Sequence, residues 1–156
     1  MTNLSVHFSS ATDDWATPQQ TFDWLNREYG PFDIDVCASA KNAKCENYFG
    51  LDNGTDGLRN PWRPYADLAT TDPVRCFMNP PYGRTIGAWV RKAYEESQRG
   101  CLVVCLLPAR TDTKWFHDYC TKGKIEFLRG RLKFGGAKNS APFPSMVVVF
   151  QRPLGV

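Results

Sequence analysis

A run of four residues, Asn79-Pro80-Pro81-Tyr82, combines groups that can hold an unreactive amine in place for reaction. An amine attached to an aromatic ring is a poor nucleophile, because its lone pair is delocalised into the ring. Two hydrogen-bond acceptors can free the lone pair by binding both N–H groups and drawing the nitrogen toward tetrahedral geometry. The Asn79 side-chain oxygen is one candidate acceptor, and the Pro80 carbonyl is the other. The four residues are therefore candidate catalytic residues.

The other groups of the run suit the same chemistry. Pro80 and Pro81 restrict the backbone so that the carbonyl points into a site and not to a neighbouring strand. Tyr82 offers a flat face on which an extruded base can stack. Asn79 is neutral, so it would position and polarise the amine without acting as a general base. The alternative is a Pro-Pro turn after a strand, with the asparagine bonding its own backbone.

The elements around this run predict an α/β sheet. Amphipathic stretches predict helices over residues 14–29, 85–98 and 113–119. Apolar or alternating stretches predict strands over residues 32–36, 75–78, 101–107, 124–128 and 145–151. Residues 43–49 fit a short helix or a strand equally well. Because strands alternate with helices, we expect helices on both faces of the sheet and a ligand beyond the carboxyl ends of the strands, where Asn79 lies.

The charge is unevenly distributed along the chain. The whole chain has a net charge of +3. Residues 11–56 carry nine acidic and three basic residues, whereas residues 110–138 carry eight basic and three acidic residues. An acidic region suits a cationic cofactor and a basic region suits a polyanion such as nucleic acid. The alternative is two solvated surfaces of opposite sign.

The composition is typical of a globular protein of one domain. The six cysteines form no C-x-x-C pair and only two histidines are present, so the spacing predicts no metal site. No apolar run approaches the roughly eighteen residues that a membrane span needs, and the N-terminus lacks the order of a signal peptide. We expect free thiols in a reducing cytosol, a disordered or loosely docked tail over residues 1–12, and a single domain over residues 13–156.

The order of the motifs resembles the phage-type DNA N-6-adenine methyltransferase (Dam) family. Asn79 to Tyr82, directly after a strand, looks like the catalytic motif of class I S-adenosylmethionine-dependent amino-methyltransferases. The resemblance covers about residues 14–151, and its other matching stretches are Trp15-Ala16-Thr17-Pro18, Phe32 to Ser39, Asp56-Gly57-Leu58, Leu107 to Thr111, Trp115-Phe116 and Gly130 to Phe134.

The resemblance implies a fold, a reaction and a setting. The fold would be a single-domain, Rossmann-like methyltransferase fold with a mostly parallel central sheet and an antiparallel last strand. The reaction would transfer a methyl group from S-adenosyl-L-methionine to N6 of an adenine flipped out of double-stranded DNA, without a metal. The setting would be the cytoplasm of a bacterial host, where a phage or prophage enzyme protects DNA from restriction. The oligomeric state and the recognition sequence stay open.

The resemblance also implies cofactor contacts. The candidates are Trp15, Thr17, Pro18, Asp35, Cys37, Ala38, Asp52, Asp56 and Asn79. Thr17 and Pro18 equally fit a plain helix start, as N-cap and first helical residue. Asp35 would meet the cationic end of the cofactor or hold the loop, and Asp52 and Asp56 also fit as turn-forming residues. One departure concerns residues 37–41, which contain no glycine where the wider class has a glycine-rich loop.

A basic stretch near the end of the chain is the expected DNA surface. The candidate DNA contacts are Arg84, Arg110, Lys114, Arg129, Arg131, Lys133 and Lys138. Cations would meet phosphates, and the glycine-containing loop over residues 129–140 would enter a groove, with residues 63–74 as a further reading segment. The alternative is a solvated hairpin loop that has no role in DNA binding. Other functions compatible with the motif are methylation of RNA adenine or of a protein glutamine, or a catalytically inactive nucleic-acid-binding module.

Overall fold

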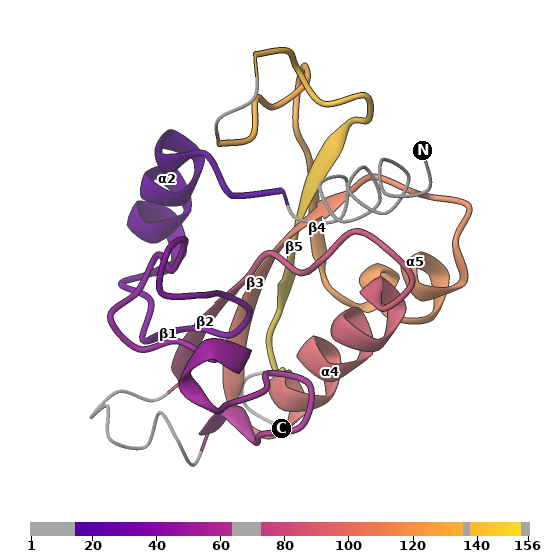
Figure 1. Ribbon diagram of the computed structural model, residues 1–156. Helices are drawn as coiled ribbons and strands as arrows, with labels where there is room; N and C mark the ends of the chain where they lie inside the picture. The colour runs from indigo at the N-terminus through magenta and orange to yellow at the C-terminus, as the bar shows by residue number, and fades with distance from the viewer. Residues whose placement is uncertain (1–14, 64–72, 136–137, 154–156) are drawn as a thin grey trace.

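A five-stranded sheet forms the centre of the computed structural model, in the order β1-β2-β3-β5-β4 (Figure 1). β1, β2 and β3 run parallel, and β5 runs antiparallel to both β3 and β4. The strands are β1 Ile34–Asp35, β2 Val74–Met78, β3 Cys101–Pro108, β4 Lys124–Phe127 and β5 Ser145–Phe150.

The structure describes residues 15–63, 73–135 and 138–153. The predicted tail over residues 1–12 and most of the candidate reading segment over residues 63–74 lie outside this part of the chain. No helix within the described residues is long and apolar enough to cross a membrane.

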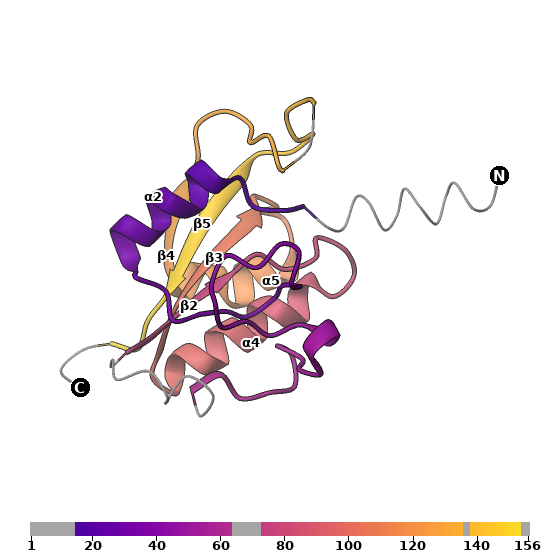
Figure 2. The same cartoon turned by 60° about the vertical axis from the view of Figure 1, so that its left-hand side comes forward.

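Helices cover both faces of the sheet. α2 (Gln19–Tyr29) lies on one face, and α4 (Ile86–Gln98) and the short α5 (Lys114–Asp118) lie on the other (Figure 2). In the described part of the chain, two short 3-10 helices, η1 (Leu51–Asn53) and η2 (Cys120–Lys122), lie in connections. The predicted α/β fold, with a mostly parallel sheet and an antiparallel last strand, is confirmed.

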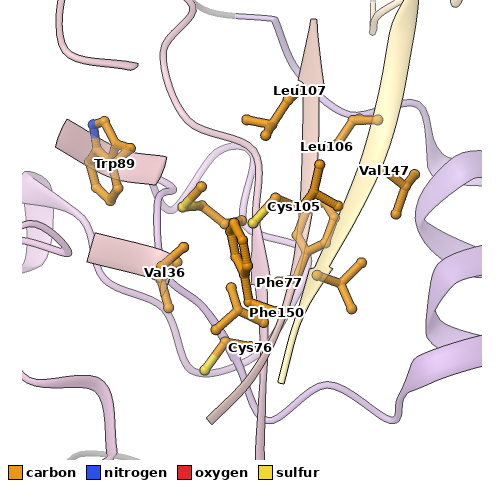
Figure 3. Packing of buried hydrophobic residues seen from close by; sticks show 14 of the residues in the cluster. Val36, Cys76, Phe77, Trp89, Cys105, Leu106, Leu107, Val147 and Phe150 are labelled. Atoms are coloured by element: carbon orange, nitrogen blue, oxygen red, sulfur yellow. The ribbon is translucent and has the colours of Figure 1, made fainter. Parts of the chain in front are cut away.

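β3 is the centre of the core, and all eight of its residues are buried. A strand that is covered on both faces reads as a continuous apolar run, which is the pattern of residues 101–107. The other buried side chains come mainly from β2, β5 and the inner sides of α2 and α4, and Figure 3 shows part of this cluster. This rigid core holds the end of β2, where Asn79 follows.

The predicted elements differ from the observed ones at three places. α2 begins at Gln19 and not near residue 14, because residues 15–18 run extended into the site. The first strand is only Ile34–Asp35. Residues 43–49 form neither a regular helix nor a strand. Tyr48 makes a single parallel bridge with Asp35, whose backbone bonds to Asn47 and Phe49, so this stretch extends the sheet without becoming a full strand.

Candidate active site

Asn79 lies at the carboxyl end of β2, in a hollow of about 190 Å³. The hollow opens between the end of β2, the extended segment before α2 and the loop after β1. Ligands of open α/β sheets bind beyond the carboxyl ends of the strands, where this hollow lies. The lining residues are Trp15, Ala16, Thr17, Asp35, Cys37, Ala38, Ser39, Asn42, Phe77, Asn79 and Pro81. Seven of the predicted site residues therefore meet here.

The Asn79 amide is held in one orientation. Its Nδ2 donates to the Trp15 carbonyl and, at 2.9 Å, to the Thr17 hydroxyl oxygen. Its Oδ1 is buried and accepts no hydrogen bond from any described residue. Because buried polar atoms are almost always paired, this acceptor leaves a place for a donor from a ligand or from an ordered water. An amide with its oxygen free is the arrangement that an N–H donor requires.

Tyr82 is enclosed, contrary to the expectation of an open stacking face. Its side chain is 3% exposed, and its hydroxyl donates to the Leu106 carbonyl at 2.9 Å. Its ring packs edge-on against Phe134 and Phe143, with centroids 6.0 and 5.7 Å away. Burial raises the pKa of the Tyr82 hydroxyl well above its usual range. The cover comes from the loop between β4 and β5, so a base can reach this ring only if that loop moves.

The prolines between these two residues have different surroundings. Pro80 is buried, whereas Pro81 is half-buried and lines the hollow around Asn79. Pro81 also lines a second hollow of about 400 Å³, which adjoins the first through Cys37, Ala38 and Ser39. The rigid corner after β2 therefore separates two connected spaces.

Asp35 lies under the first hollow and holds the loop after β1. Its Oδ1 accepts from the Cys37 backbone N–H at 3.3 Å and its Oδ2 from the Lys44 N–H at 3.1 Å. Burial raises the pKa of Asp35 from 3.8 to about 7, against the lowering effect of these two hydrogen bonds and of the Lys44 charge. Asp35 thus supports the loop, and its carboxyl is also part of the lining.

The second hollow joins apolar and acidic side chains. Besides the shared residues, its lining comprises Phe49, Gly50, Leu51, Asp52, Thr55, Asp56, Gly57, Leu58 and Trp89. Asp52 accepts from the Ala40 N–H at 2.8 Å, and Asp56 accepts from the Leu58 N–H at 2.9 Å. Both acids therefore shape their loops, as the turn-forming alternative expects, while they also line this space.

The missing glycines after β1 are supplied from the facing segment. A Cβ at Gly50 would lie 2.2 Å from the Ala38 carbonyl, and one at Gly57 would lie 2.0 Å from the Val36 carbonyl. Among the described residues, no non-glycine residue has a positive φ, so the loop over residues 37–41 needs no glycine of its own. The close backbone approach that a glycine-rich loop would provide is made by Gly50 and Gly57 from the other side.

The two hollows fit an elongated cofactor with a cationic end and a flat ring. The first offers the buried Asp35 carboxyl. The second offers apolar surface from Leu58 and Trp89 beside Asp52. Within the described part of the chain, no group of three or more His, Cys, Asp or Glu side chains is arranged to hold a metal ion.

The predicted DNA contacts fall into two groups. Arg84, Lys114, Arg129, Arg131, Lys133 and Lys138 are exposed. Arg110 is half-buried and donates to the Tyr82 carbonyl at 3.2 Å, so it holds the backbone of the run from Asn79 to Tyr82 in place. Lys114 begins α5 and lines a separate hollow with Trp115, between α4 and α5. The β4–β5 loop, which carries Arg129, Arg131, Lys133 and Lys138, extends from the end of the sheet beside the N-terminal end of α2 (Figure 1).

The β4–β5 loop, residues 128–144, packs directly on the segment that holds Asn79. The Gly135 N–H donates to the Ala16 carbonyl at 2.9 Å. The Trp15 ring packs edge-on against Phe134 and Phe143, at 5.4 and 5.3 Å. The sequence indicated Phe134 only as the end of a stretch that matches the family, and it gave no role to Phe143. Aromatic side chains in an otherwise polar, glycine-containing loop were the available signal.

Comparisons with known proteins agree with these features. Residues 5–154 match the family described as DNA N-6-adenine-methyltransferase (Dam). A protein of Escherichia phage T1 with the name DNA N-6-adenine-methyltransferase is 32% identical over 106 residues, which are 68% of this chain and 40% of that protein. A protein of the same name from Haemophilus phage HP1 is 28% identical over 151 residues, covering 91% of this chain and 80% of the relative. The putative methyltransferase YfdM of Escherichia coli K12 is 34% identical over 71 residues, covering 45% of this chain and 71% of that protein.

Proposed function

This chain belongs to the DNA N-6-adenine-methyltransferase (Dam) family, and we propose that it transfers a methyl group from S-adenosylmethionine to N6 of adenine in DNA. The observation that carries the proposal is the Asn79 amide, whose nitrogen is bound on the protein side and whose buried oxygen is left without a partner. The likeness to two phage proteins named for this activity supports the same substrate.

The catalytic role that we assign to Asn79 is to hold the reacting amine. Its Oδ1 accepts one N–H of the adenine amino group and the Pro80 carbonyl accepts the other. Two fixed acceptors draw the nitrogen toward tetrahedral geometry and direct its lone pair at the methyl group. Asn79 is neutral, so it takes no proton in this step, and the methylated nitrogen loses its extra proton to water.

The cofactor would occupy the two connected hollows. S-adenosylmethionine, when bound, supplies a methyl group activated by its sulfonium. Asp35 would attract the cationic amino-acid end in the first hollow. Leu58 and Trp89 would bury the adenine ring in the second, and Asp52 and Asp56 would bind the ribose and ring polar groups. Trp15, Pro18, Cys37 and Ala38 would complete the binding surface.

The DNA would be held by the exposed cations around the site. Arg129, Arg131, Lys133 and Lys138 on the β4–β5 loop, with Arg84 and Lys114, would contact phosphates. The target adenine would flip out of the duplex toward Asn79. In a phage or prophage, such methylation in the host cytoplasm would protect DNA from restriction.

Analysis of methylated nucleosides tests this proposal. The purified chain is incubated with S-adenosylmethionine and unmethylated duplex DNA, and the digested nucleosides are separated by mass spectrometry. We expect N6-methyldeoxyadenosine with the natural chain. We expect none above background with Asn79→Ala, which should still bind the cofactor in calorimetry. Asn47→Ala, an exposed asparagine outside both hollows, is the matched control and should stay active.

Three outcomes would contradict the proposal. Methylation of duplex RNA or of a glutamine peptide, but not of DNA, would keep the cofactor and change the substrate. DNA binding without any heat from S-adenosylmethionine would indicate an inactive binding module. Full activity of Asn79→Ala would remove Asn79 from the reaction.

A further inference from the structure

We propose that Thr17 is a positioning residue for the Asn79 amide: its hydroxyl oxygen binds Nδ2 and so keeps Oδ1 turned away from the protein and free to accept. The inference rests on the proposed function, in which Oδ1 holds the reacting amine. It gives Thr17 a contact with Asn79 that neither a helix-capping role nor a cofactor contact explains.

The contacts of Thr17 exclude the role of helix cap. The N-cap of α2 is Pro18, and no side chain caps the helix. Thr17 is 6% exposed, and its hydroxyl oxygen accepts from Asn79 Nδ2 at 2.9 Å. The side-chain oxygen of an N-cap residue accepts from a backbone N–H of the first helical turn. The Thr17 oxygen accepts from a side-chain amide instead, so it positions that amide and not the helix.

The Trp15 carbonyl is the second acceptor that fixes the orientation of the Asn79 amide. A carbonyl can only accept, so it binds Nδ2 and disfavours the reversed amide, which would bring two acceptor oxygens together. The carbonyl satisfies one of the two N–H groups of Nδ2, and the Thr17 oxygen satisfies the other. Without Thr17, one buried N–H would have no acceptor, and the amide would turn to find another partner.

The segment that presents both groups is itself held in place. The Ala16 carbonyl accepts from the Gly135 N–H at 2.9 Å, and the Trp15 ring packs against Phe134 and Phe143. A Cβ at Gly135 would lie 3.4 Å from the Ala16 Cβ, which shows how closely the two backbones approach. The amide orientation is therefore set by residues 15–17, and these are set by the β4–β5 loop.

Isosteric and conservative variants test the proposal. Thr17→Val keeps the shape of the side chain and removes the acceptor, whereas Thr17→Ser keeps the hydroxyl. We expect the single-turnover methylation rate, at saturating cofactor and DNA, to fall about tenfold in Thr17→Val and to stay within about threefold of the natural chain in Thr17→Ser. Thr121→Val, which removes an exposed hydroxyl on η2, is the matched control and should leave the rate unchanged.

Two further measurements separate positioning from cofactor contact and from loss of structure. Calorimetry should give the same S-adenosylmethionine affinity for both Thr17 variants, within about threefold. Nitrogen-15 NMR of the cofactor-free protein should show slow hydrogen exchange for the Asn79 side-chain amide and fast exchange for the exposed Asn47 amide. The slow exchange should be lost in Thr17→Val and kept in Thr17→Ser.

The outcomes distinguish this proposal from the proposed function. A natural chain that makes no N6-methyladenine overturns the function, while the NMR comparison still tests the amide contact. An active chain in which Thr17→Val keeps its rate and its slow amide exchange overturns the positioning role. Weakened cofactor binding in Thr17→Val, with an unchanged rate at saturation, also overturns it and assigns Thr17 to the cofactor. If Thr17→Val fails to fold, fast exchange of the Asn79 amide in the natural chain is sufficient to reject it.

Discussion

The Arg110 guanidinium donates from Nη1 to the Tyr82 backbone carbonyl at 3.2 Å and so connects the end of β3 to the run from Asn79 to Tyr82. The sequence suggested Arg110 as a phosphate contact, and the structure also gives it a bond to the protein itself. A cation that is half-buried against a backbone carbonyl keeps that backbone in place. The two roles lead to different salt dependences.

We predict that Arg110→Ala lowers the rate of methylation about tenfold without changing the salt dependence of DNA binding. The loss would come from a less rigid Asn79-to-Tyr82 corner. Lys114→Ala, at the exposed start of α5, is the comparison and should flatten the salt dependence while the rate at saturation stays constant. Single-turnover rates and DNA binding at several salt concentrations provide the measurement. A flattened salt dependence in Arg110→Ala would favour the phosphate contact.

Removal of charge from the β4–β5 loop should weaken DNA binding. Arg131 and Lys133 are exposed, and each phosphate contact contributes about 0.9 to the slope of the logarithm of affinity against the logarithm of salt concentration. We predict that the double variant Arg131→Ala/Lys133→Ala reduces this slope by about two. Arg27→Ala/Arg152→Ala removes the same charge from exposed positions outside the loop and should keep the slope. An equal reduction in both double variants would argue for a general charge effect.

The buried Asp35 should make cofactor binding depend on pH. Burial raises its pKa to about 7, so at pH 6 the carboxyl of the free protein is mostly neutral. A cationic ligand favours the ionised form, so affinity should rise with pH, by about tenfold between pH 6 and pH 8. Calorimetry in two buffers of different ionisation enthalpy should also show proton release on binding near pH 7. Asp35→Asn should remove both effects, and a pH-independent affinity of the natural chain would contradict the assignment.

The same pKa determines how the stability of the cofactor-free protein depends on pH. The pKa of Asp35 in the folded protein lies above its value of 3.8 in the unfolded chain. Between these two values the folded state holds a proton that the unfolded state lacks, so the free energy of unfolding contributed by Asp35 is greatest below about pH 4 and falls as pH rises to about 7. Denaturant titrations across this range should show a steeper decline in the natural chain than in Asp35→Asn.

Tyr82→Phe should cost stability without removing the ring. The hydroxyl donates to the Leu106 carbonyl in a buried setting, and its loss leaves that acceptor with one bond fewer. We predict a loss of about 1 kcal/mol, or about 3 °C in Tm for a chain of this size. Tyr48→Phe removes a longer bond to Asp52 at an exposed position and should change Tm by less. Thermal unfolding checks the pair, and equal shifts would mean that burial of the Tyr82 hydroxyl is not decisive.

Gly57→Ala should damage the cofactor site through the backbone. The added Cβ would lie 2.0 Å from the Val36 carbonyl, and a backbone atom cannot turn aside as a flexible side chain can. We predict a loss of at least about 2 kcal/mol in unfolding free energy and weaker cofactor binding. At Gly87, in the first turn of α4, a Cβ would meet nothing closer than 3.6 Å, so Gly87→Ala should leave stability unchanged or raise it by up to about 1 kcal/mol. A tolerated Gly57→Ala would show that the loop after β1 yields easily.

The sequence predicted the elements whose signals are local. The apolar run of β3 and the break at Pro80 and Pro81 place Asn79 at the carboxyl end of a parallel strand, where the structure has it. Residues 43–49 had no decisive pattern, because their contact with β1 is one bridge and a few backbone bonds. Their conformation depends on the neighbouring Asp35 and not on their own periodicity.

The features that were missed depend on contacts between distant parts of the chain. Tyr82 is covered by Phe134 and Phe143, more than fifty residues away, and local patterns carry no information on such a cover. Thr17 has the residue type of a helix cap, yet its hydroxyl oxygen accepts a hydrogen bond from the side chain of Asn79, 62 positions later. The loop after β1 lacks glycine because Gly50 and Gly57, which are distant in sequence, provide the close approach to its backbone.

The direction of β5 has a practical consequence for handling the protein. Because β5 runs antiparallel to β3, the chain leaves β5 at the amino ends of the parallel strands, whereas Trp15 binds Asn79 at their carboxyl ends (Figure 1). A dye, an affinity handle or a fused partner attached after Pro153 would stand clear of the surface where we place DNA. The same addition just before Trp15 would crowd that surface, so single-molecule or immobilised assays should tether the protein by its C-terminal side.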